Sequence, residues 1–128
     1  MEQYTIGVTG HRKLPPKRLP SLTAEIQAFY QEQTARYGAE NITVLSPLAE
    51  GADTLCAKLA LDAGLRLVAP LPMSAKEYRR DFSGPAAVAF DNLLLLAGEV
   101  LVAPPEEAAN PRRGFYYRQA GIYVALRV

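Results

Sequence analysis

Short runs of β-branched and aliphatic residues alternate along the chain with longer segments in which apolar residues recur every three or four positions. Continuous apolar runs are typical of buried strands, and the wider spacing is typical of amphipathic helices. The runs predict four strands, at 4–8, 42–46, 65–69 and 100–102. The wider spacing predicts helices at 21–37, 52–63 and 86–97, with a short one after Ser74. Residues 113–126 favour a helix, although their β-branched and aromatic content also suits a strand.

This alternation predicts one α/β domain over residues 1–128, a three-layer αβα Rossmann-like sandwich with a mostly parallel sheet of about four or five strands. Ser21 is the expected N-cap of the first helix, and Gly38 and Gly64 are stop signals for the first two. In open parallel sheets, ligands bind beyond the carboxyl ends of the strands, where the strand order reverses. The residues after each strand are therefore the candidates for a site.

Composition narrows the classes of function. The 128 residues include 14 Lys and Arg against 13 Asp and Glu, a net charge of +1. Proteins held on nucleic acid by bulk charge are far more basic, so nucleic acid is not an expected partner. One cysteine, Cys56, and one histidine, His11, exclude a disulfide framework and a Cys-rich zinc site, and no metal is expected. No apolar run approaches membrane-spanning length and no signal peptide is evident, so we expect no membrane partner and a cytoplasmic location.

The turn after the first strand, Thr9-Gly10-His11-Arg12, is the first candidate binding segment. Arginine can hold a phosphate or carboxylate through two parallel hydrogen bonds. His11 could donate to a phosphate or orient a ribose. The structural alternative is that His11 bonds a neighbouring loop while Arg12 is solvated. The position at the sheet edge favours ligand contact.

The turn after the second strand leads into Glu50-Gly51-Ala52-Asp53, the second candidate. Gly51 allows a ligand to approach the backbone closely at a helix N-terminus, where free N–H groups favour an anion. Asp53 is also a natural capping residue, so the segment could do no more than start a helix. Glu50 and Asp53 could act as an acid/base pair or bind Mg²⁺, but nothing else completes a metal site.

Tyr78 is the third candidate. It lies four residues before Phe82, so the two rings share one helical face, while Arg79 and Arg80 turn away from it. Core packing of the aromatic rings, with the arginines solvated, is the favoured interpretation. Tyr78 could still form the wall of a pocket beside a base or ribose.

Three segments together, Ile6 to Arg12, Ser46 to Asp53, and Leu71-Pro72 with Tyr78 and Asp81-Phe82, resemble the SLOG superfamily of Rossmann-like domains. This superfamily includes DNA-processing protein A and the Lonely Guy enzymes, and the closer similarity is to its YpsA-related branch. The resemblance implies a nucleotide-type ligand at the carboxyl edge of the sheet. By position it implies that Gly10, His11 and Arg12 form the first binding loop and Glu50, Gly51 and Asp53 the second.

The chain also departs from these relatives. The PGGxGTxxE motif of the Lonely Guy enzymes is absent, and there is no tryptophan where the closer branch usually has Trp-Asp-Gly after a further strand. Because such a strand would follow Val128, we expect an exposed sheet edge and hence a homo-oligomer, or a shortened product with impaired ligand binding.

The expected function is a sensor or binding module for a nucleotide or nucleotide-derived phosphate ligand, with no other cofactor. The first alternative is a phosphoribohydrolase-like enzyme in which Glu50 or Asp53 polarises water. The second is a DNA-handling protein, in which the basic loop from Arg12 to Arg18 touches phosphates. The last is a remnant with no ligand.

Overall fold

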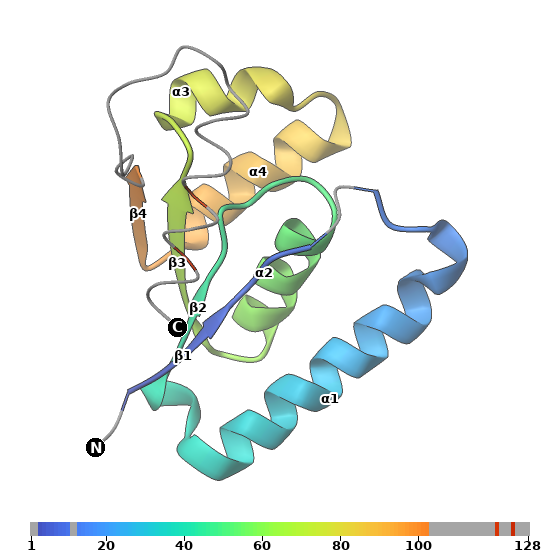
Figure 1. The fold of residues 1–128 in the computed structure, drawn as a ribbon, viewed down its shortest axis with the longest axis vertical. Coiled ribbons are helices and arrows are strands. Elements are labelled where there is room, and N and C mark those ends of the chain that lie inside the picture. Colours follow the sequence, from blue (N-terminus) through green and yellow to red (C-terminus); the bar gives the residue numbers. More distant parts are fainter. Residues whose placement is uncertain (1–2, 11–12, 103–119, 121–123, 125–128) are drawn as a thin grey trace.

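One parallel sheet organises the chain and confirms the α/β fold class (Figure 1). The computed structural model describes residues 3–10 and 13–102, together with Ala120 and Val124. Its strands are β1 (Tyr4–Gly7), β2 (Ile42–Leu45), β3 (Arg66–Leu71) and β4 (Glu99–Val102). They lie in the order β1-β2-β3-β4, and every neighbouring pair is parallel. All four carboxyl ends therefore meet at one edge.

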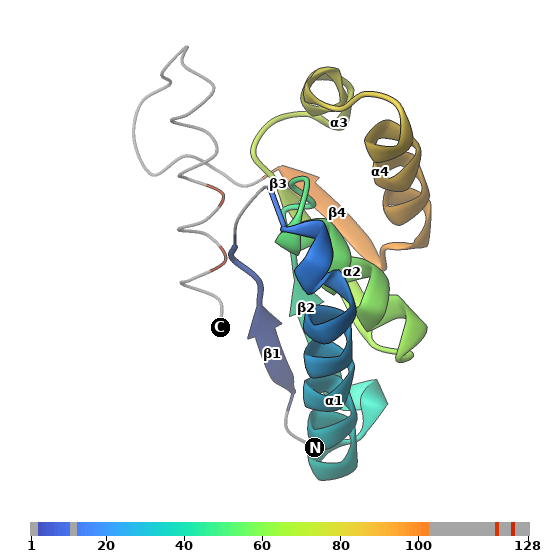
Figure 2. The ribbon, with the colours of Figure 1, turned by 90° about the vertical axis from the view of Figure 1, so that its right-hand side faces the viewer.

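The helices between the strands cover one face of this sheet, as Figure 2 shows. They are α1 (Leu19–Tyr37), α2 (Ala52–Asp62), α3 (Ala75–Tyr78) and α4 (Pro85–Leu96). Because the strands follow one another in sequence order, crossovers of the same hand place their helices on the same face. The four described strands contain no reversal of order. The prediction that a ligand binds where the order reverses is therefore wrong for this part of the sheet.

The opposite face is contacted by a helical residue from near the end of the chain. Leu45 and Val68 alternate with Val44 and Leu67, which face the helices, so they point to the other side. Val124 is helical, 4% exposed, and packs against Leu45 and Val68. Helical residues thus lie on both faces of the sheet, as in a Rossmann-like αβα sandwich.

Two apolar clusters fill the space between the sheet and its helices. The first joins β3, α2, α3 and α4, and includes Leu67, Leu71 and Phe90. The second joins β2, α1 and α2, and includes Val44 and Tyr30. No described helix has both the length and the apolar character needed to cross a bilayer.

Prolines account for the two largest differences from the predicted boundaries. The first helix begins at Leu19 rather than after Ser21, because Pro20 in the first turn lacks an N–H that a helix would leave unpaired there anyway. The Ser21 hydroxyl instead donates to the Arg18 carbonyl oxygen at 3.0 Å. Strand β3 continues through Pro70 to Leu71. Its pairing with β2 ends at Val68, so Pro70 interrupts no hydrogen bond with that strand.

Candidate functional site

The two predicted binding turns meet at the carboxyl edge of the sheet. Beyond β1, the backbone N–H of Val8 still donates to the Leu45 carbonyl oxygen at 3.0 Å, which holds the chain beside β2. Gly10 then lies against the first residue of α2: a Cβ added to Gly10 would be 2.5 Å from the Cβ of Ala52. Only glycine fits at this approach without movement of the backbone. Thr9 and Gly10 are exposed beside it.

The start of α2 depends on a glycine conformation. Gly51 is the N-cap residue with φ 94° and ψ −126°, a region that is essentially restricted to glycine. The expectation that Asp53 caps this helix is wrong, because Asp53 is already the second helical residue. Gly51 has no side chain that could accept from the first-turn N–H groups, and among these the Thr54 N–H donates to the Ala49 carbonyl oxygen at 3.1 Å. The positive end of the helix dipole therefore faces the turn that holds Gly10.

Buried hydrogen bonds fix the turn between β2 and α2. The Ser46 hydroxyl, fully buried, donates to the Asp53 carbonyl oxygen at 2.9 Å and accepts from the Leu48 N–H at 3.2 Å. Leu48, also fully buried, has a positive φ of 62°, an uncommon conformation for a bulky residue. The turn thus stores backbone strain that core packing holds in place. It leaves Glu50 exposed and Asp53 buried.

A cavity of about 320 Å³ opens next to Thr9, and sequence reasoning did not identify it. It lies between the end of β1, α1 and the second turn of α2. Its lining is mainly apolar with a single charged group: Ile6, Gly7, Val8, Thr9, Glu25, Ile26, Phe29, Tyr30 and Cys56. The feature of the sequence that could have indicated this cavity is the four-residue spacing of Glu25 and Phe29, which places both on one face of α1.

Tyr30 and Cys56 form the deep wall of this cavity, and neither side chain ionises near neutral pH. The Tyr30 hydroxyl donates to the Cys56 carbonyl oxygen at 2.9 Å. Burial raises the pKa of Tyr30 strongly, and the nearby Cys56 adds to the shift. Burial also raises the pKa of the Cys56 thiol, and the charge of Asp53 raises it further. The hydrogen bond with Tyr30 lowers this pKa in part. The thiol therefore stays protonated near neutral pH.

Tyr78 lies in the core. It is 1% exposed, and its ring meets those of Phe82 and Phe90 edge to face, with centroids 5.1 and 5.5 Å apart. The two rings are in contact as predicted, but Phe82 follows the helical residues in an extended conformation, so the prediction that they share a helical face is wrong. Arg79 and Arg80 turn outward as predicted, and Arg79 forms a bidentate pair with Asp91 at 2.8 and 3.0 Å. Tyr78 belongs to the same buried apolar cluster as Leu48 of the turn between β2 and α2.

Of the predicted site residues, the structure brings Gly10 against Ala52, while His11 and Arg12 lie outside the described residues. Within the part of the chain that the structure describes, no three His, Cys, Asp or Glu side chains are grouped to hold a metal ion. The chain matches no protein-family model and no curated protein sequence.

Proposed function

We propose that this chain is a cytoplasmic binding module that senses a nucleotide or nucleotide-derived ligand, with the phosphate at the N-terminus of α2. The observation that carries the proposal is the contact between Gly10 and Ala52, which brings an exposed glycine turn against a helix start that has no side-chain cap. A phosphate needs several N–H donors and a positive potential, and a helix N-terminus supplies both. In the sequence, Gly10 is followed by His11 and Arg12, and we assign Arg12 to the phosphate.

The test is a thermal-shift screen with AMP, GMP, ADP-ribose, cyclic nucleotides and NAD. A ligand at a hundred times its Kd stabilises a fold by about 2.7 kcal/mol, which is roughly 10 °C for a domain of this size. Arg12→Ala should abolish the shift. Arg36→Ala is the matched control, because Arg36 is exposed in the last turn of α1, at the end remote from the carboxyl edge. A screen without any shift would contradict the proposal.

Turnover separates this module from the hydrolase alternative. Glu50 is exposed at the turn before α2, so Glu50→Gln changes its charge without disturbing the core. In a binding module this variant and the wild type leave the bound nucleotide intact, as followed by chromatography of the mixture. Release of free base by the wild type and its loss in Glu50→Gln would establish the enzyme instead.

Self-association is proposed for the same chain on a separate observation. Leu95 and Leu96, consecutive residues at the end of α4, are 83% and 65% exposed. Exposed apolar side chains of this size gather at protein interfaces more than on isolated monomer surfaces. Light scattering over a range of concentrations should show a homo-oligomer that Leu95→Glu dissociates. A monomer at high concentration would contradict this.

A further inference from the structure

The cavity beside Thr9 is placed to hold the part of a ligand that extends away from the phosphate. Ala52 touches Gly10, and Cys56, four residues later, lines the cavity. Residues four apart lie one above the other on a helix, about 6 Å along its axis. The cavity is thus one helical turn from the proposed phosphate position, a distance that a single ribose bridges. Its volume of about 320 Å³ lies at the lower end of the range for small-molecule pockets.

The lining selects a flat aromatic group. Phe29 is 42% exposed on the wall formed by α1, an unusual exposure for a large apolar ring next to a cavity. Its neighbours in the lining, Ile6, Val8 and Ile26, provide apolar surface but no hydrogen-bonding side chain. Nucleobases stack on such rings because every base has a π-face.

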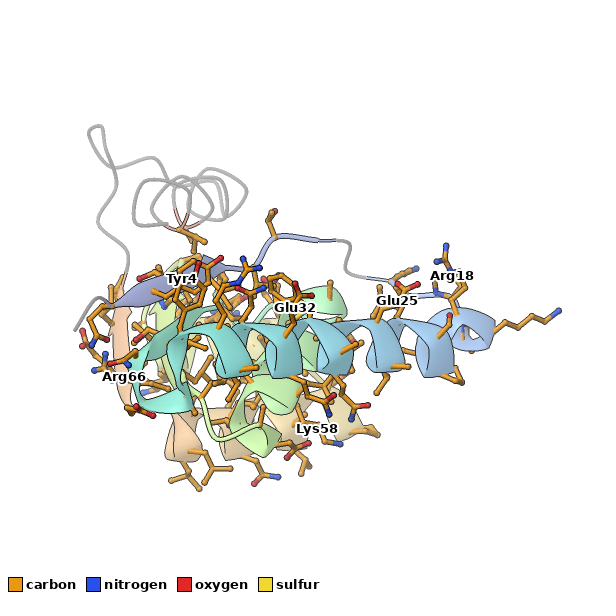
Figure 3. All side chains as sticks on the ribbon, turned by 90° about the horizontal axis from the view of Figure 1, so that it is seen from below. Tyr4, Arg18, Glu25, Glu32, Lys58 and Arg66 are labelled. Atoms are coloured by element: carbon orange, nitrogen blue, oxygen red, sulfur yellow. The ribbon has the colours of Figure 1, made fainter. Side chains whose placement is uncertain are left out.

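One acidic group sets the hydrogen-bonding pattern. Glu25 and Phe29 are four residues apart, so carboxylate and ring form the same wall of α1. Figure 3 shows Glu25 on α1, two turns before Glu32. An ionised carboxylate only accepts hydrogen bonds, and its two oxygens match two adjacent N–H donors. Guanine presents N1–H and the 2-amino group side by side, whereas adenine places an acceptor next to its amino group. The Tyr30 hydroxyl already donates to the Cys56 carbonyl oxygen, and the other hydroxyl of the lining, that of Thr9, lies after β1 and not on the wall that carries Glu25.

We infer that this cavity is a base-recognition site for a guanine nucleotide, in which Phe29 stacks on the base and Glu25 accepts its N1–H and 2-amino hydrogens. The inference rests on the proposed function, because the phosphate is taken to lie at the start of α2. It assigns the choice between bases to α1, whereas the proposed function concerns only the two turns.

Calorimetry with GMP, IMP and AMP tests the pattern of donors. IMP retains N1–H but lacks the 2-amino group, so we expect it to bind about tenfold more weakly than GMP, and AMP about a hundredfold more weakly. Glu25→Gln should reduce that preference about tenfold or more, and Phe29→Ala should weaken all three ligands about tenfold. Both side chains are exposed, so the fold should tolerate these changes. Glu32→Gln is the matched control, the same change on an exposed residue of α1 that is not part of the described lining.

Cys56 reports where the base lies. It is the chain's only cysteine, so alkylation at pH 8 monitors this cavity alone. Saturating GMP should slow the reaction at least fivefold, and pyrophosphate should not. Equal affinities for the three nucleotides, with binding still lost in Arg12→Ala, would overturn the guanine site and leave the proposed function standing. Binding of GMP without protection of Cys56 would also overturn it. Binding of no nucleotide would refute both.

Discussion

Adding one methyl group at Gly10 tests the contact that joins the two turns. The Cβ of Gly10→Ala would lie 2.5 Å from the Cβ of Ala52, far inside van der Waals contact, so the turn and α2 must separate. Gly10 is not among the glycines with positive φ, so the cost is steric rather than conformational. Overpacking of this kind costs about 1–3 kcal/mol, and the Tm should fall by roughly 4–12 °C.

A second substitution removes the obstacle. Ala52→Gly deletes the opposing methyl group, at a cost of up to about 1 kcal/mol for glycine in a helix. In this background Gly10→Ala has room, and it should be neutral or stabilising by up to about 1 kcal/mol, because alanine restricts the unfolded chain more than glycine does. The effect of one substitution thus changes sign with the other.

Urea denaturation of the four proteins in this cycle measures the coupling free energy between the two positions. We expect the double variant to be more stable than the sum of the single effects by at least about 1 kcal/mol. Additive effects within a few tenths of a kcal/mol would refute the contact and, with it, the observation that supports the phosphate site. An unchanged slope with urea concentration is needed for the comparison.

Three further predictions concern titratable groups. Tyr30→Phe removes the hydrogen bond to the Cys56 carbonyl and should lower the free energy of unfolding, measured with urea at pH 7, by about 1 kcal/mol. Because burial raises the Tyr30 pKa above 10.0, the stability of the wild type should fall as the pH rises past 10.0, and the variant should lack that loss. Hydrogen bonds from Arg79 lower the pKa of Asp91, so this pair stabilises the fold above pH 3.8 and loses its effect as the pH falls through the lowered pKa. In an acid titration of stability, Arg79→Gln should lack this loss. Cys56 should react with iodoacetamide more slowly at pH 7.5 than a solvent-exposed thiol, and a rate equal to that of glutathione would contradict its raised pKa.

The elements of the sheet were predictable because burial on both faces leaves an unambiguous signal. Ile42 to Leu45 and Leu67 to Leu71 are almost continuously apolar, and both lie in the sheet. Their ends were not predictable to the residue. Whether Pro70 stops a strand depends on which neighbour pairs at that position, and the position of the first helix turn depends on whether Pro20 falls where an N–H is needed. Both are properties of the assembled sheet and helix.

The meeting of the two turns was predictable in outline, since parallel strands end at a common edge. The sequence did not predict that the turns approach so closely that a methyl group added at Gly10 would overlap Ala52. This distance depends on how closely α2 packs beside β1. The role of Ser46 was not predictable either. Its hydroxyl forms two hydrogen bonds of the second turn, yet in the sequence it is only the last residue of a predicted strand.

The cavity escaped prediction for a more general reason. In a β-α-β unit the helix runs back along the strands, so its first turns lie beside the same edge as the turns after each strand. Glu25 and Cys56 both stand in the second turn of their helices, and both reach this edge. A search limited to the residues after each strand therefore finds Val8 and Thr9 but none of the lining residues on the helices. Helix α1 carries the only charged side chain in the described lining, Glu25, which is why base selectivity should respond to substitutions on α1.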